Sequence, residues 1–155
     1  MEGKETGKKK KKNNRRLVAY IDGSSKGLYG YWMDGKTHVV RDHPMTNNQA
    51  EWLALYYLLL DLPYYSECDV YSDSMLVVNQ FNGDYQVKDE DLRRIYNSCK
   101  TLVVLKHLKI NLNWVSRKNN VFGKILEKEL AKERLRRWQL DEGENRQDPY
   151  SEQVY

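Results

Sequence analysis

Three acidic residues, each in a different local sequence, are the first candidates for chemistry in this chain. Asp22 follows the run 17–21, which is rich in β-branched and aromatic residues, and Asp73 follows a similar run over 68–72. Glu51 lies between them in an apolar segment. Alone, each has an ordinary explanation, because Asp-Gly pairs make turns and acids favour the first turn of a helix. Together, three carboxylates from three elements predict a site for a hard divalent cation.

The elements that would carry these acids follow from the apolar pattern and the turn signals. Strands are predicted over 17–22, 28–33, 37–41, 68–72 and 108–115, and helices over 50–60, 74–81, from a cap at Asp89 or Asp91 to about 105, and from 121 onward. Three strands joined by short turns favour an antiparallel meander, and the later strands alternate with helices. We therefore expect an α/β fold with a five-stranded mixed sheet and helices packed on it.

Two of these helices have apolar faces at helical spacing. The helix over 50–60 is expected to bury Ala50, Leu53, Ala54, Tyr57 and Leu58, with Glu51 at the edge of that face. The last helix is expected to bury Val121, Ile125, Leu126 and Leu130, followed by Leu135 and Trp138.

Length and composition limit the class of protein. The chain has 155 residues, of which 40% are hydrophobic and 31% charged, as in a soluble single domain. No apolar run reaches the roughly 18 residues that a membrane span needs. Cys68 and Cys99 lack the spacing of a disulfide or zinc framework, so reduced thiols are expected. We expect an intracellular, cytoplasmic monomer without membrane contact.

The two ends of the chain differ in charge. Residues 1–16 hold eight Lys or Arg against two Glu, with Lys8–Lys12 unbroken. Such a segment is expected to be disordered, and it suits a solubilising tail, a contact to nucleic-acid phosphates or a nuclear address. Residues 141–155 hold five acids and one Arg. The expected division is a basic tail over 1–16, a folded domain over 17–140 and an acidic tail over 141–155.

The motifs around the three acids resemble those of the type 1 ribonuclease H family. They are Tyr-Ile-Asp22-Gly-Ser, the strand start from Gly27 to Gly30, Thr46-Asn-Asn-Gln-Ala-Glu51, Tyr-Ser-Asp73-Ser, and Trp-Val-Ser-Arg117-Lys-Asn-Asn120. The resemblance covers roughly residues 17–135, and the Thr46–Glu51 stretch is the most specific part of it.

This resemblance implies a ribonuclease H-like fold and an endonuclease that cuts the RNA strand of RNA–DNA hybrids with Mg²⁺ or Mn²⁺. It implies that Asp22, Glu51 and Asp73 are the catalytic metal ligands. Amide side chains can donate and accept hydrogen bonds around 2′-hydroxyls and base edges in the minor groove of a hybrid. The substrate contacts that we carry over are Gly23, Ser24, Asn47, Asn48, Gln49, Ser74 and Asn120.

The chain departs from the family pattern at one catalytic position. The family usually supplies a fourth acid early in the last helix, and aligning Arg117 and Asn120 places Lys124 there. A lysine ammonium cannot ligate a cation. Three readings follow: Lys124 replaces a second metal ion electrostatically, Glu127 supplies the missing ligand, or the protein binds hybrid and cuts it poorly or not at all.

Overall fold

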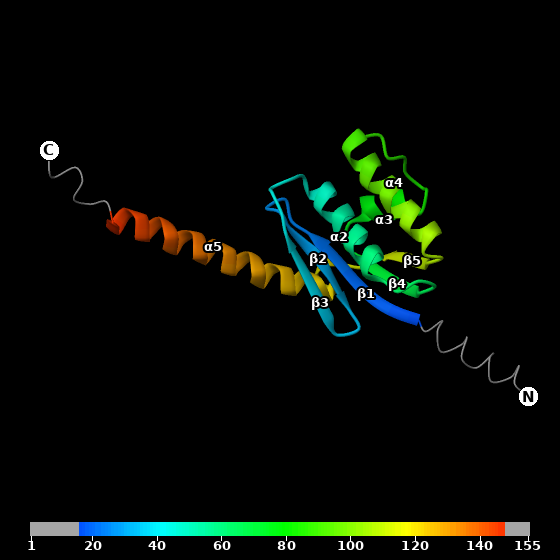
Figure 1. The fold of residues 1–155 in the computed structure, drawn as a ribbon, viewed down its shortest axis with the longest axis horizontal. Coiled ribbons are helices and arrows are strands. Elements are labelled where there is room, and N and C mark those ends of the chain that lie inside the picture. Colours follow the sequence, from blue (N-terminus) through cyan, green and yellow to red (C-terminus); the bar gives the residue numbers. More distant parts are fainter. Residues whose placement is uncertain (1–15, 148–155) are drawn as a thin grey trace, which may run out of the picture.

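The first three strands form an antiparallel meander in the computed structural model, which describes residues 16–147 (Figure 1). They are β1 (Arg16–Gly23), β2 (Leu28–Met33) and β3 (Lys36–Arg41). β2 pairs with β1 and β3, and both pairings are antiparallel. The predicted meander is confirmed.

The remaining strands join the other side of β1 in parallel. They are β4 (Glu67–Ser72), which pairs with β1, and β5 (Lys109–Trp114), which pairs with β4. The sheet order is therefore β3-β2-β1-β4-β5. The helices that alternate with these strands are α2 (Asn47–Asp61), α3 (Met75–Phe81), α4 (Glu90–Leu105) and α5 (Val121–Gln147). This is the five-stranded mixed sheet that the sequence predicts.

Alternating side chains of β1 divide the core between the two faces of the sheet. Leu17, Ala19 and Ile21 belong to the large core under α2, α3 and α4. Tyr20 packs on the opposite face, in a smaller core around Phe122 of α5. Because Asp22 has the same parity as Tyr20, its side chain leaves β1 on the α5 side.

Helix α2 buries more of its circumference than its predicted face. Trp52, Leu55 and Leu59 are fully buried, whereas Leu53 and Tyr57 are only partly buried. The reason is that α2 packs against both the sheet and α4, so that two sides of the helix are covered.

The predicted face of α5 is wrong at its first residue and at its end. Val121 is exposed, and Phe122, which was not predicted, is completely buried. The short 3₁₀ turn η1 (Arg117–Asn119) and the side chain of Asn120, which accepts a hydrogen bond from the Phe122 N–H, set this helical register. Leu135 and Trp138 are more than half exposed because α5 projects beyond the sheet at that point (Figure 1).

The predicted tails lie partly inside and partly outside the described residues. The boundary expected at residue 140 falls within α5, which continues to Gln147. The basic segment 1–15 and residues 148–155 lie outside the described part of the chain. Within the described residues, no helix combines the length and the apolar character needed to cross a membrane.

Candidate active site

Strand β1 carries Asp22 to the edge of the sheet next to the start of α5. The Gly23 N–H donates a hydrogen bond of 2.9 Å to Asp22 Oδ1. A Cβ at Gly23 would lie 2.4 Å from the Ala50 carbonyl carbon and 2.7 Å from the Glu51 nitrogen. Glycine therefore allows the first turn of α2 to pass directly over the end of β1.

Helix α2 holds Glu51, just after its first turn, beside Asp22. Thr46 caps this helix: its hydroxyl accepts from the Gln49 N–H at 3.1 Å, and Gln49 Oε1 accepts from the Thr46 N–H at 3.2 Å. Glu51 is only 7% exposed. Its Oε2 is buried and has no hydrogen-bond partner among the described residues, which is costly for a carboxylate oxygen unless a cation occupies the site.

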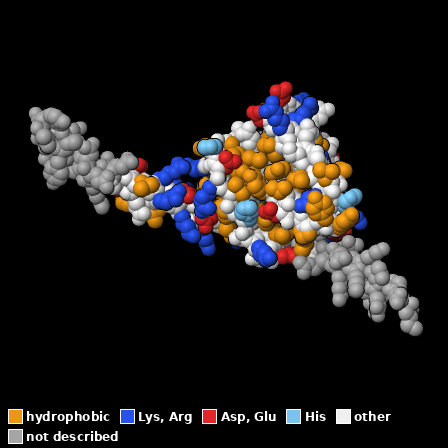
Figure 2. All heavy atoms as spheres, in the orientation of Figure 1, with side chains coloured by type: hydrophobic (Ala, Val, Ile, Leu, Met, Phe, Trp, Pro, Cys, Tyr) orange, Lys and Arg blue, Asp and Glu red, His pale blue; other side chains and the backbone are white. Residues whose placement is uncertain are grey.

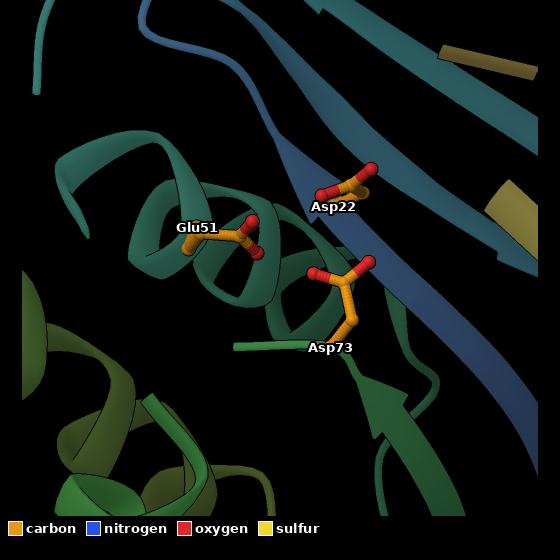
Figure 3. A group of neighbouring side chains, drawn as sticks. All are labelled: Asp22, Glu51 and Asp73. Atoms are coloured by element: carbon orange, nitrogen blue, oxygen red, sulfur yellow. The ribbon is translucent and has the colours of Figure 1, made fainter. Parts of the chain in front are cut away.

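Asp73 completes the group from the end of β4. One oxygen from each of Asp22, Glu51 and Asp73 lies within 4.8 Å of the other two. Figure 3 shows the three carboxylates converging from β1, α2 and the end of β4. The predicted meeting of three acids from three elements is present in the structure.

The electrostatics of this group favour a bound cation. Burial raises the pKa of Glu51 well above its ordinary value, and the charge of Asp22 raises it further. Burial also raises the pKa of Asp22, as does the charge of Asp73. Three crowded carboxylates repel one another, and a divalent cation would relieve that repulsion. The donor set and the unpartnered Glu51 oxygen therefore fit a hard divalent ion.

A cleft of about 250 Å³ opens beside Asp22. Its lining combines residues from β1, α2, η1 and α5: Asp22, Gly23, Ser24, Asn47, Arg117, Gly123, Leu126, Glu127 and Leu130. The positive charge of Arg117 acts on Asp22 and lowers its pKa, against the larger effect of burial. Arg117 entered the sequence analysis only as part of a motif, and its place beside the acid became visible only in the structure.

The predicted substrate contacts divide between the cleft wall and the helix caps. Gly23, Ser24 and Asn47 line the cleft, and Asn47 Oδ1 accepts a hydrogen bond of 3.0 Å from the Ser25 N–H. Asn48 is half-buried in the first turn of α2, next to Asn47.

Gln49 and Ser74 have local structural partners. Gln49 belongs to the capping box of α2, and the Ser74 hydroxyl caps α3 by accepting from the Val77 N–H at 3.3 Å. Both side chains are half-buried.

The prediction that Asn120 contacts the substrate is wrong. It is completely buried, so that it has no surface for a substrate to reach. Its Nδ2 donates to the Ile21 carbonyl at 2.9 Å and to Asp73 Oδ2 at 3.2 Å. Its Oδ1 accepts from the N–H groups of Phe122 and Gly123. Asn120 thus ties the start of α5 to β1 and to one of the three acids.

Lys124 is exposed and is not among the cleft-lining residues that the structure describes. Gly123 faces the site instead: a Cβ there would lie 3.3 Å from Asp22 Oδ2. Glu127, one turn after Gly123, lines the cleft but is not part of the group of three carboxylates. The close approach of Gly123 to Asp22 depends on how α5 packs against β1, which no local sequence pattern predicts.

Comparison with known proteins agrees with this fold. The model of the RNase H family matches residues 14–134. The chain is 31% identical over 122 residues to the bifunctional protein Rv2228c of Mycobacterium tuberculosis. The aligned region covers 70% of this chain and 33% of that relative. The chain therefore spans about a third of the length of that curated relative.

The solved structures similar to this one include two ribonuclease H domains. The N-terminal RNase H domain of Rv2228c, solved as a fusion with maltose-binding protein, has a TM-score of 0.54 at 29% identity, covering 69% of this chain and 86% of that one. LC11-RNase H1, isolated from compost and solved in complex with an RNA/DNA hybrid, has a TM-score of 0.63 at 23% identity, covering 71% of this chain and 92% of that one. The latter similarity is one of fold. By its family match, its fold and its motifs, the chain belongs to the type 1 ribonuclease H family.

Proposed function

We propose that this protein is a divalent-metal-dependent endoribonuclease that hydrolyses the RNA strand of RNA–DNA hybrids. The observation that carries the proposal is the group of three carboxylates, whose oxygens lie within 4.8 Å of one another beside an open cleft. The family and the hybrid-bound structural neighbour support it.

The residues of the cleft have separate roles in this proposal. Asp22, Glu51 and Asp73 would hold Mg²⁺ or Mn²⁺, which activates a water molecule and neutralises charge on the scissile phosphate. Arg117 offers a guanidinium that can bind a phosphate oxygen beside Asp22. Asn47 lines the same cleft, and its amide, which accepts a hydrogen bond from the Ser25 N–H, would contact the minor groove of the hybrid.

A direct cleavage assay tests the proposal. Labelled RNA–DNA hybrid, duplex RNA and duplex DNA are incubated with the protein in Mg²⁺, in Mn²⁺ and in EDTA. We expect products from the hybrid alone, and only with a metal ion. Asp73→Asn removes one carboxylate charge with little change in shape and should abolish cleavage. The control Asp84→Asn changes an exposed acid in the loop after α3 and should leave the rate unchanged. Cleavage that persists in Asp73→Asn would contradict the proposed site.

A second candidate function is hybrid binding with weak or no cleavage, and Lys124 favours it. The family pattern places an acid there, and the substitution exchanges a possible cation ligand for a cation. This candidate predicts that the protein retains labelled hybrid in a binding assay while forming few products. Lys124→Asp would then increase cleavage strongly, whereas the control Lys128→Asp, which makes the same charge change at an exposed position one turn further on, would not.

A further inference from the structure

One face of α5 runs from the active-site cleft to the part of the helix that projects beyond the sheet. Leu130 lines the cleft and also lines a second, smaller hollow of about 50 Å³. The other residues around that hollow are Lys26, Leu28, Glu133, Arg134 and Arg137. The two hollows therefore adjoin at Leu130.

Helical spacing places the residues of this surface in one row. Gly123, Glu127, Leu130, Arg134 and Arg137 follow one another at intervals of three or four residues, so they lie on the same side of α5. From Gly123 to Arg137 the helix rises about 21 Å, at 1.5 Å per residue. We call the distal part of this row, together with Lys26 in the β1–β2 turn, the distal basic patch: Lys26, Arg134 and Arg137.

Within the described residues, no ion pair compensates the charge of the distal basic patch. All three side chains are exposed, and none of them forms a salt bridge with a side chain in the described part of the protein. Glu133, the acid beside them, is already engaged by Arg41 at 3.2 Å and by Arg136 at 2.7 Å. Asp141 lies one turn beyond Arg137 and marks the end of the basic stretch. Figure 2 shows Lys and Arg side chains gathered on α5 close to the sheet.

We propose that the distal basic patch is a second binding site for the nucleic-acid backbone, holding phosphates of the same hybrid whose scissile phosphate lies in the cleft. This inference rests on the proposed function. The 21 Å rise of α5 from Gly123 to Arg137 corresponds to the length of about six nucleotides, at about 3.4 Å of duplex axis per nucleotide, so one hybrid is long enough to contact both the cleft and the patch. Guanidinium groups suit such a contact because they can donate two parallel hydrogen bonds to a phosphate.

The test measures binding and cleavage separately. Fluorescence anisotropy with a labelled 18-base-pair hybrid in EDTA gives Kd at several salt concentrations without cleavage. The double variant Arg134→Gln/Arg137→Gln is compared with Lys128→Gln/Lys132→Gln, which removes the same charge from the opposite side of the same helix. We expect Arg134→Gln/Arg137→Gln to raise Kd about tenfold at low salt and to reduce the slope of log Kd against log salt concentration by about 2. The control Lys128→Gln/Lys132→Gln should leave both quantities nearly unchanged.

Several outcomes would overturn the inference. Equal Kd values for the first variant and the unaltered protein would do so, as would equal weakening by both variants, because the effect would then depend on net charge alone. Lys26→Gln, in a different element, provides an independent variant should the α5 substitutions disturb folding, and an unchanged Kd there also counts against the patch.

A parallel cleavage assay in Mg²⁺ separates this inference from the proposed function. Cleavage with no effect of the α5 variant on Kd refutes the patch alone. Weaker binding by that variant, in a protein that never cleaves, refutes the nuclease alone.

Discussion

Replacing Asn120 by alanine should destabilise the protein by about 3 kcal/mol, according to the hydrogen bonds of its buried amide. Losing the two bonds that Oδ1 accepts at the start of α5 removes a helix cap, which costs about 1 kcal/mol. Losing the Nδ2 donor leaves the buried Ile21 carbonyl without this 2.9 Å bond, which costs about 2 kcal/mol. The sum corresponds to a fall in Tm of about 6–12 °C for a domain of this size.

Urea unfolding followed by circular dichroism in EDTA measures this cost without a bound metal. The matched control is Asn119→Ala, since Asn119 is the exposed neighbour in the same turn. Asn120→Asp keeps the acceptor but places a second carboxylate where Nδ2 now donates to Asp73 at 3.2 Å. We therefore expect Asn120→Asp to recover part of the stability and to lose most of the cleavage. If Asn120→Ala unfolds within about 0.5 kcal/mol of the unaltered protein, the positioning role given to Asn120 is wrong.

Two further predictions concern Glu51 and Gly23, the glycine over which α2 passes. Because burial raises the pKa of Glu51 in the folded state, its ionisation should make the metal-free protein less stable as the pH rises through that pKa. Glu51→Gln should remove part of this loss, so that in EDTA the variant is more stable than the unaltered protein at pH 8, and the difference in stability shrinks at pH 4. Thermal melts at both pH values measure this difference. A variant that is less stable than the unaltered protein at pH 8 would contradict the raised pKa of Glu51. Gly23→Ala should cost about 1–3 kcal/mol, because the added Cβ would lie 2.4 Å from the Ala50 carbonyl carbon, and should slow cleavage by moving Glu51 away from Asp22. Gly143→Ala, where an added Cβ meets nothing within 4 Å, is its control, and equal stability of the two variants would refute the steric argument.

The sheet and the three acids could be predicted because both depend on short-range patterns. Alternation along Leu17, Ala19 and Ile21 marks a strand with one face in the large core, and the parallel pairing of β1 and β4 brings the ends of both strands to the same edge. Asp22 near the end of β1 and Asp73 just after β4 must then lie near each other. Glu51 joins them because the capping box at Thr46 fixes where α2 begins.

The features that the sequence did not predict depend on contacts between distant elements. Phe122, and not Val121, is buried because the Asn120 side chain sets the register of α5 while donating to β1. The periodicity of α5 does not contain that information, because the hydrogen-bond partner of Asn120 is Ile21, which is 99 residues away in the sequence. The same dependence explains why Asn120 looked like a substrate contact and is a buried link between α5, β1 and Asp73.

The structure places Lys124 outside the group of three acids. Gly123 is the residue of α5 that approaches Asp22, and the next residue along a helix is turned by about 100°. Lys124 is accordingly exposed, and it is not among the described residues that line the cleft. A lysine instead of an acid at position 124 would change the charge near the cleft, while one oxygen from each of Asp22, Glu51 and Asp73 lies within 4.8 Å of the other two. Lys124→Asp should therefore change the charge near the site without moving the three acids. Its effect on the cleavage rate, compared with that of Lys128→Asp, measures how much an acid at position 124 contributes.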